Sequence, residues 1–246
     1  MAVGLGLLFN IRLPINFNSP YKAGSIIDFW RRWHITLSRF LRDHVYIPLG
    51  GSRKGEVRRL VNVFLTMLLG GFWHGAGWTF VAWGALHGFA LVVNHGWHAW
   101  SGEQRIGASS AARNALKVLI TFIVVVCGWV LFRAESFTGA MNIYGAMIGA
   151  NGLGWAKYSS NELLRWDYGF SFIALGAFIV WCLPNSQQLM RRHRLTLEEP
   201  KLKLEAVRPR WLVHYFTYGW GILLGMLAAY ALISISRGGE FLYFNF

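Results

Sequence analysis

The stretch that decides the fold is Leu60–Trp100, with the sequence LVNVFLTMLLGGFWHGAGWTFVAWGALHGFALVVNHGWHAW. It is apolar enough to enter a lipid bilayer, yet it carries four histidines: His74, His87, His95 and His98. Ionisable side chains are costly at membrane depth, so they usually face the interior of a helix bundle or a water-filled cavity. These histidines are therefore the first candidates for function.

Small residues frame two of the four histidines. His74 lies within Gly71–Gly75, and His87 lies within Gly84–Gly88. A Gly-x-x-x-Gly spacing lets the backbone of another helix approach closely. We therefore expect both imidazoles to be buried against protein and not against lipid, and we expect the stretch to form a hairpin with its apex near His74–Trp78.

The composition predicts an all-α fold: a polytopic integral membrane helix bundle with interfacial amphipathic helices. Of the 246 residues, 54% are hydrophobic and 14% are charged, and long apolar runs alternate with short basic ones. The net charge of +13 lies in loops beside Trp and Tyr, which favours the lipid bilayer as the partner over nucleic acid. Cys127 and Cys182 fall inside predicted spans, where we expect small buried side chains and no disulfide.

A basic amphipathic helix is predicted to start at Ser25, because Ser25-x-x-Asp28 is a capping box. His34 lies at the margin of its apolar face and should point towards whatever the helix covers. Arginines occupy the opposite face, as in helices that lie in the membrane interface. The apolar face is predicted to contain Ile26, Trp30, Trp33, Leu37, Phe40 and Leu41.

The other predicted elements follow from apolar runs and turn residues. In chain order they are the end of a helix over Met1–Leu13, a transmembrane helix over Leu116–Phe132, a re-entrant or interfacial segment over Phe137–Ala150, a span over Tyr168–Leu183, a basic loop over Gln187–Arg210, a last span over Trp211–Ile235 and an aromatic end, Phe241–Phe246.

From the residues alone, several kinds of chemistry remain open and others are disfavoured. His74 fits a structural histidine with a buried partner as well as a catalytic one, whereas His87 is expected to be packed and hydrogen-bonded in its helix. His95 and His98 are expected at the interface. No Cys, Asp or Glu lies near these last three histidines in sequence to complete a ligand set, so we predict no metal and no bound cofactor.

The basic loop Asp43–Gly55 (DHVYIPLGGSRKG) lacks the spacing of a P-loop, so nucleotide hydrolysis is unsupported. Arg53 and Lys54 fit a cytosolic membrane anchor. The alternative is that these two residues, or their neighbours, attract the phosphates of a ligand by simple electrostatics.

Several motifs together resemble the membrane-bound O-acyltransferases. The run Asp28–Ser38 (DFWRRWHITLS) is followed by Arg42-Asp43, by Tyr46–Gly51 (YIPLGG) and by Trp73–Gly75 (WHG). The set is most similar to the bacterial branch that contains the alginate O-acetylation protein. Trp129–Glu135 (WVLFRAE) and the aromatic end also resemble that branch.

The resemblance implies a multi-helix, multi-pass protein of the bacterial cytoplasmic (inner) membrane. It implies that His74, in the Trp-His-Gly motif, is the catalytic residue and that His34 is the second active-site histidine. It further implies a cytoplasmic acyl thioester as donor, such as acetyl-CoA, and an extracytoplasmic polysaccharide as acceptor. Periplasmic proteins that take part in the acetylation are the partners that it implies. Members of the branch are longer, so residues 1–246 are predicted to be the C-terminal portion of a single transmembrane domain.

The leading functional hypothesis is an O-acetyltransferase that uses a histidine as general base and acts on hydroxyls of a cell-envelope or extracellular polysaccharide. One alternative is transfer of D-alanine or another acyl group to teichoic acid or a different acceptor. The other is a membrane scaffold or transporter without chemistry.

The charge distribution predicts the topology. Residues 31–59 contain eight Lys and Arg and residues 191–210 contain seven, whereas residues 134–167 contain two. Positive loops stay in the cytoplasm. Cysteines introduced into 31–59 and 187–210 should therefore react with a membrane-impermeant thiol reagent only after the membrane is permeabilised, whereas cysteines in 134–167 should react in intact spheroplasts. Labelling of 191–208 from the periplasmic side alone would contradict this topology.

Overall fold

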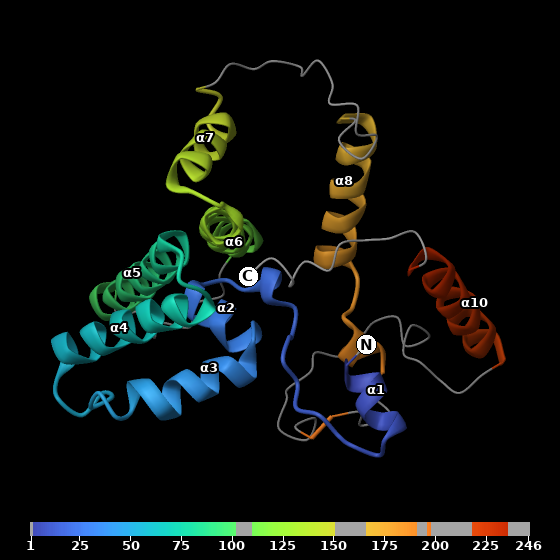
Figure 1. Ribbon diagram of the computed structural model, residues 1–246, viewed down its shortest axis with the longest axis horizontal. Coiled ribbons are helices and arrows are strands. Elements are labelled where there is room, and N and C mark those ends of the chain that lie inside the picture. Colours follow the sequence, from blue (N-terminus) through green and yellow to red (C-terminus); the bar gives the residue numbers. More distant parts are fainter. Residues whose placement is uncertain (1, 102–109, 151–165, 191–195, 198–217, 236–246) are drawn as a thin grey trace. The chain divides into compact units, whose positions relative to one another are not determined.

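The computed structural model describes residues 2–101, 110–150, 166–190, 196–197 and 218–235, and all regular structure within them is helical, as the sequence predicts (Figure 1). The described residues belong to two compact units, one of residues 16–183 and the other of residues 1–15 with 184–246. The α-helices are α1 (Ala2–Leu8), α2 (Ile26–Arg32), α3 (Ile35–Leu41), α4 (Glu56–His74), α5 (Trp78–Ser101), α6 (Ala111–Arg133), α7 (Phe137–Met147), α8 (Trp166–Cys182), α9 (Ser186–Leu189) and α10 (Tyr218–Ile235). A 3₁₀ turn, η1 (Pro20–Lys22), and a π-helical turn, η2 (Arg42–Tyr46), lie beside α2 and α3 in sequence.

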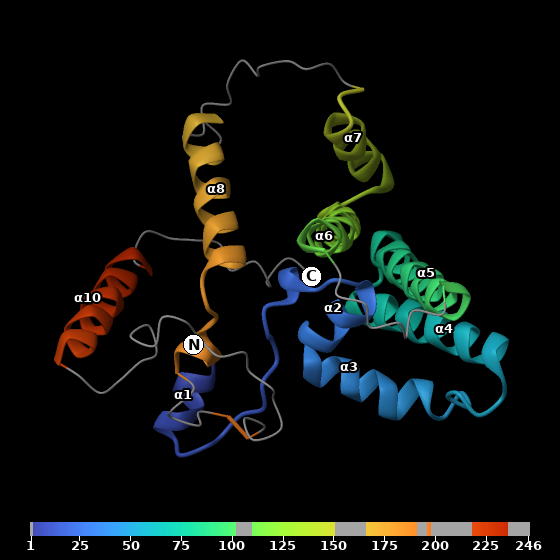
Figure 2. The same ribbon diagram turned by 180° about the vertical axis from the view of Figure 1, so that it is seen from behind.

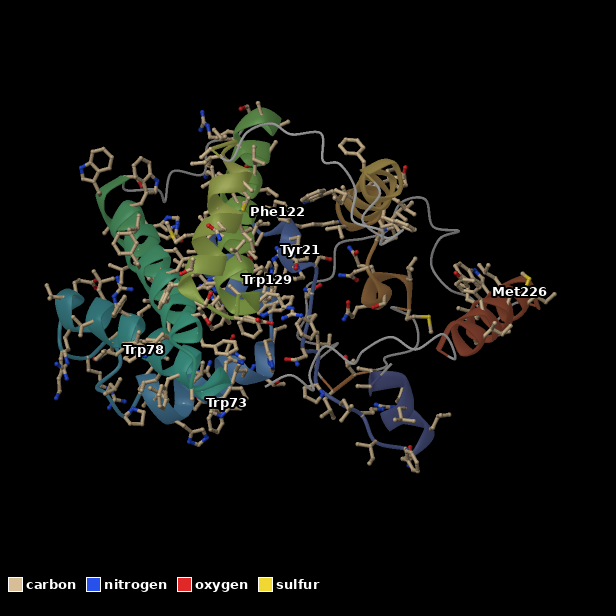
Figure 3. All side chains as sticks on the ribbon, turned by 45° about the horizontal axis from the view of Figure 1, so that its top comes forward. Tyr21, Trp73, Trp78, Phe122, Trp129 and Met226 are labelled. Atoms are coloured by element: carbon tan, nitrogen blue, oxygen red, sulfur yellow. The ribbon has the colours of Figure 1, made fainter. Side chains whose placement is uncertain are left out.

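Helices α4 and α5 form a tightly packed hairpin within the unit of residues 16–183 (Figures 1 and 2). A Cβ atom on Gly84 would lie 2.5 Å from the carbonyl oxygen of Met67, and one on Gly71 would lie 3.0 Å from the Cα atom of Gly84. The two backbones therefore touch where the small-residue pattern predicts close approach. The turn between the helices confirms the predicted apex, and Figure 3 shows Trp73 and Trp78 beside it.

Helix α2 begins as predicted, but the amphipathic helix does not continue. The backbone N–H of Asp28 donates to Ser25 Oγ over 3.1 Å, which confirms the cap. The prediction of one continuous helix is wrong, because the chain breaks between α2 and α3 at His34, whose φ is 43° and ψ is 54°. The break resets the helical phase, so Phe40, which was expected on the apolar face, is 54% exposed.

Helix α6 is the one helix in the described part of the chain that is long and apolar enough to cross a membrane, with 23 residues and a mean hydropathy of 2.5. It contains the predicted span Leu116–Phe132. The histidines, glycines and asparagine of α5 lower its hydropathy, so α5 is less apolar than a simple lipid-facing helix. The predicted segments Phe137–Ala150 and Tyr168–Leu183 correspond to α7 and α8.

Helix α8 is attached to the same unit through its C-terminal turn. The indole Nε1 of Trp181 donates to the carbonyl oxygen of Tyr21 over 3.0 Å, and Lys22 Nζ donates to the Leu183 carbonyl over 2.9 Å. The rings of Trp181 and Phe122 meet with centroids 5.0 Å apart. Figure 3 shows Tyr21 and Phe122 near one another beside α6. Segment η1 is thus held between α6 and α8.

In the unit of residues 1–15 and 184–246, α1 ends at Leu8, earlier than the predicted helix end at Leu13. Helix α10 lies within the predicted last span, Trp211–Ile235. Most of the predicted basic loop Gln187–Arg210 and all of Phe241–Phe246 lie outside the described residues.

The main apolar core lies where α2 meets α4, α5 and α6. It contains Phe29 and Trp30 from α2, Trp83 from α5 and Val125 from α6, all at most 9% exposed. Cys127 is half-buried, but Cys182 is exposed, so the expectation that both thiols are buried is wrong for Cys182.

The contact at Gly84 predicts a stability difference between two glycines of the same helix. Gly84→Ala should lower the free energy of unfolding by about 1–3 kcal/mol, because its methyl group collides with backbone that cannot move aside easily. Gly96→Ala is the matched control: no atom lies within 4 Å of the added Cβ, so the change should be neutral or stabilising. Thermal unfolding in detergent measures both, and equal midpoints for the two variants would refute the close-packing account.

Candidate active site

His74 is the last residue of α4, at the turn that connects the two helices of the hairpin. Its ring centroid lies 5.2 Å from Trp83 of α5 and 5.1 Å from Phe132 of α6, and both contacts are edge-on. The ring of Trp73 lies 5.2 Å away on the same helix. His74 is half-buried, so its imidazole is held among aromatic rings yet keeps contact with the surroundings. This is the environment that a histidine needs if it is to meet a substrate.

His34 occupies the break between α2 and α3, and the segment before η1 holds the break in place. The backbone N–H of Ile35 donates to the Asn16 carbonyl over 3.0 Å, and the Thr36 N–H donates to Asn16 Oδ1 over 3.1 Å. The N–H of Asn18 donates to the Arg32 carbonyl over 2.9 Å. Backbone groups that the break would leave unpaired are therefore satisfied from a distant segment.

The conformation of His34 is unusual for a residue with a side chain. A non-glycine residue in the left-handed region is uncommon, and such residues cluster at functional sites. Its Nδ1 atom is buried and has no hydrogen-bond partner among the described residues. Burial lowers the pKa of His34 below its usual value, which favours the neutral imidazole near neutral pH.

Ring contacts link His34 to His74 although 40 residues separate them in sequence. His34 contacts Phe17, and Phe17 contacts Trp33, with ring centroids 6.0 and 4.8 Å apart. The two histidines share the aromatic cluster, because Trp33 contacts Trp129, and Trp129 contacts Phe132 beside His74, with ring centroids 4.9 and 5.8 Å apart. The prediction that α2 and α3 fold over the hairpin and bring His34 towards it is thus in accord with the structure.

His87 lies deeper in the core, with 2% of its surface exposed. It is packed, as predicted, by Trp30 and Trp83 with ring centroids 5.3 and 4.9 Å away. The expected hydrogen bond is not seen at Nδ1, which has no partner in the described part of the chain. No group of three potential metal ligands occurs among the described residues.

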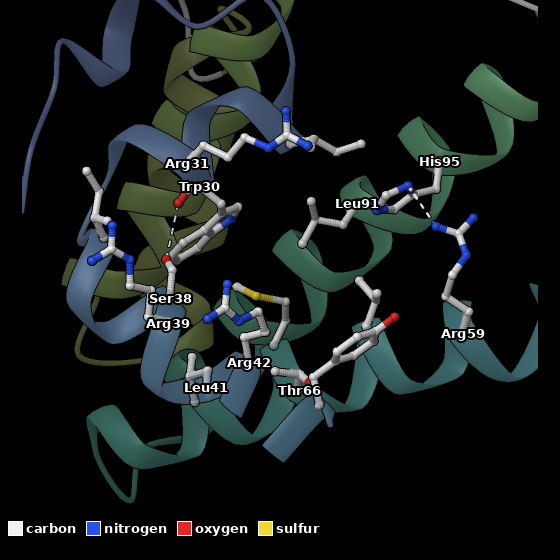
Figure 4. Close-up of a pocket in the computed structure, with 15 residues that line it drawn as sticks. Trp30, Arg31, Ser38, Arg39, Leu41, Arg42, Arg59, Thr66, Leu91 and His95 are labelled. Carbon is white, nitrogen blue, oxygen red and sulfur yellow. Dashed lines mark hydrogen bonds between the residues drawn. The ribbon is translucent and has the colours of Figure 1, made fainter. Parts of the chain in front are cut away.

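A cavity of about 620 Å³ opens between α2 and α3 on one side and α4 and α5 on the other (Figure 4). Trp30, Met67 and Leu91 supply apolar lining. The hydroxyl of Ser38 donates to the Trp30 carbonyl over 3.2 Å, which ties α3 to α2 at the cavity wall. Trp30 therefore belongs both to this cavity and to the core around His87.

The cavity is strongly basic. Its four arginines come from α2, α3, η2 and α4, and they are Arg31, Arg39, Arg42 and Arg59. No acidic side chain is among its described lining residues; Asp43 and Glu56 pair with two of the arginines from outside the lining. We refer to this cavity as the arginine pocket.

His95 is the polar residue of α5 that faces the arginine pocket. Its Nδ1 atom lies 3.3 Å from Arg59 Nη1 (Figure 4). Because a guanidinium only donates hydrogen bonds, Nδ1 accepts and the ring hydrogen sits on Nε2. His98, by contrast, is exposed near the end of the same helix. Of the two histidines predicted to be interfacial, His95 thus lines this cavity, and His98 lines a second one bordered by α5 and α6.

Arg53 and Lys54 are exposed in the turn before α4 and are absent from the lining of the arginine pocket. The structure therefore separates the basic residues of this region into an exposed pair and a cavity-lining group. Sequence reasoning missed Arg31, Arg39 and Arg42 as a pocket because it placed them on a solvated helix face. Their spacing over α2, α3 and η2 held no signal for a shared cavity, since the break at His34 decides where each one points.

A family model for the membrane-bound O-acyltransferases matches residues 1–134, which is more than half of the chain and includes both His34 and His74. The chain belongs to the membrane-bound O-acyltransferase family.

The chain is similar to several named relatives, each over a different share of its length. The chain is 41% identical to a peptidoglycan O-acetyltransferase of Helicobacter pylori over 100% of its own length and 45% of the relative's. It is 50% identical to a probable alginate O-acetylase of Pseudomonas aeruginosa over 60% of the chain and 27% of the relative. It is 30% identical to a teichoic acid D-alanyltransferase of Streptococcus thermophilus over 53% of the chain and 35% of the relative. The chain thus spans half or less of the length of these curated relatives.

Proposed function

We propose that the protein containing this chain is a multi-pass enzyme of the bacterial inner membrane that transfers an acetyl group from a thioester to hydroxyls of a cell-envelope or extracellular polysaccharide. The observation that supports the proposal is the continuous set of aromatic contacts that links His34 to His74. The higher identity to relatives named as O-acetyl-transferring proteins favours acetyl over D-alanyl transfer.

In the proposed reaction, His74 removes the proton from the acceptor hydroxyl as its oxygen attacks the thioester carbonyl carbon. The carbon–sulfur bond then breaks, and the proton returns from His74 to the leaving thiolate. A histidine is suited to this exchange because its unperturbed pKa of about 6.5 lies near the operating pH. His34 supports the step by hydrogen-bonding the carbonyl oxygen or by orienting the acceptor.

This mechanism predicts the effect of removing each histidine. In membranes that carry the whole encoded protein, His74→Ala should lower acetyl transfer about 10²–10⁴-fold, because it removes the general base. His34→Ala should lower transfer by the same factor or less. His98→Ala, a control at an exposed histidine, should leave transfer unchanged.

The measurement is transfer of labelled acetyl from acetyl-CoA to purified glycans, with a parallel reaction that supplies a labelled D-alanyl thioester. Near-normal acetyl transfer by folded His74→Ala protein would remove this base from the mechanism, whereas no transfer of either acyl group by the wild-type protein would leave a membrane scaffold as the function. Transfer of D-alanine in place of acetyl would replace the donor and acceptor but keep the histidine chemistry.

The arginine pocket is proposed to hold the phosphates of the thioester donor. Its four guanidinium groups supply planar donors for phosphate oxygens, and its apolar lining fits the uncharged arm between phosphate and sulfur. Arg53 and Lys54 keep their predicted role as exposed charges that attract the donor from solution. The two groups of basic residues then act at different stages of binding.

The two stages predict different kinetics. Arg31→Gln combined with Arg39→Gln should raise the KM for the donor at least ~10-fold with little change in kcat, because charge-assisted hydrogen bonds to a bound phosphate are lost. Arg53→Gln combined with Lys54→Gln should give a smaller rise that disappears at high salt, since exposed charges are screened.

Both pairs are measured in detergent, where membrane anchoring does not contribute. An unchanged donor KM in the Arg31/Arg39 variant would exclude these two residues from donor binding. An unchanged KM in the Arg53/Lys54 variant at low salt would leave membrane anchoring as the role of that pair.

A further inference from the structure

His87 is a buried polar residue that the proposed mechanism does not use. It is 2% exposed, and its Nδ1 atom has no hydrogen-bond partner among the described residues. Burying an unpartnered polar group costs free energy, which an apolar side chain of similar volume would avoid. A space-filling role alone is therefore a poor account of a histidine at this position.

Trp83 connects His87 to the proposed base. The indole of Trp83 contacts His74 edge-on, with centroids 5.2 Å apart and planes at 88°. The imidazole of His87, one helical turn further along α5, contacts the same indole with centroids 4.9 Å apart. Trp83 is only 4% exposed, so the position of its ring is set by packing. His87 and His74 thus both contact one buried ring.

Two residues of α6, one helical turn apart, lie against the rings of His74 and His87. Phe132 contacts the ring of His74 with centroids 5.1 Å apart. At Gly128, a Cβ atom would lie 2.5 Å from Nε2 of His87, so the backbone of α6 lies directly against the imidazole. The flat ring of His87 has no room to move towards α6. Any displacement of it must be passed to Trp83, Trp30 or Phe29, whose ring centroids lie 4.9, 5.3 and 6.2 Å away.

We propose that His87 is a positioning residue, which is wedged against Gly128 and holds Trp83 edge-on to His74. The inference rests on the proposed function, because it assigns His87 a role through the base. In this arrangement the indole limits the rotation of the His74 ring and so sets the direction in which its lone pair meets the acceptor hydroxyl. Geometry, and not proton transfer by His87, is its contribution to the reaction.

The tests use three substitutions in the whole encoded protein. His87→Leu retains volume and removes the unpartnered nitrogen, so it folds, but its branched side chain cannot reproduce the tilted ring contact with Trp83. His87→Ala leaves space beside Gly128. Gly128→Ala leaves His87 chemically intact and pushes its ring from behind.

Each substitution should lower kcat about 10–100-fold while the KM values for donor and acceptor stay unchanged, because displacing a reacting group by about 1 Å has costs of this size. The double variant His87→Ala/Gly128→Ala should lose no more than His87→Ala alone, since the added methyl group enters the vacated space. Val125→Ala is the control: this residue of the same core is 2% exposed, and its truncation should lower the thermal midpoint without changing kcat.

Wild-type kcat in folded His87→Leu and His87→Ala proteins would overturn the positioning role, as would multiplicative losses in the double variant. These outcomes are separable from failure of the proposed function. If His74→Ala is inactive while the His87 variants are fully active, only the positioning role fails. If His74→Ala is fully active, the role of His74 as the base fails, and if the wild-type protein transfers no acetyl, the proposed function itself fails.

Discussion

The structure of this unit depends on the contact between the backbones of α4 and α5. Gly71 and Gly84 have no room for a Cβ atom, so the two helices approach more closely than side chains would permit. Close approach leaves the bulky residues of the hairpin on its outer faces, where Trp83 meets α2 and α6. The aromatic cluster around His74 is a consequence of that displacement. Small residues at the helix contact thus decide where large ones gather.

A second constraint is the break at His34. Helical periodicity predicted one helix through this point, because each residue on either side is a reasonable helix former. The competing interaction comes from Asn16, whose carbonyl and side chain satisfy the first N–H groups of α3. Eighteen residues separate Asn16 from His34, so no local pattern contains this information. At His34, which the family motif marks as functional, these tertiary hydrogen bonds therefore outweigh the helix propensity of the local sequence.

The parts that could be predicted are those with local causes. The cap at Ser25 and the turn after His74 depend on neighbouring residues, and both were found from the sequence. The contact of His87 with Gly128 joins two residues that lie on different helices and 41 positions apart in sequence. The arginine pocket depends on the break in the helix at His34. Motif similarity identified His34 and His74 without geometry. Motif similarity did not indicate that His87 would be buried without a hydrogen-bond partner for Nδ1.

Trp30 joins the two parts of the proposed reaction. One side of its indole lines the arginine pocket, and its ring also contacts Trp83 and His87 in the core. A wall made of a packed aromatic ring resists displacement, since core rings are fixed by many contacts. Under the proposed mechanism, the packing that would orient the base through Trp83 would also keep it apart from the guanidinium groups of the charged cavity.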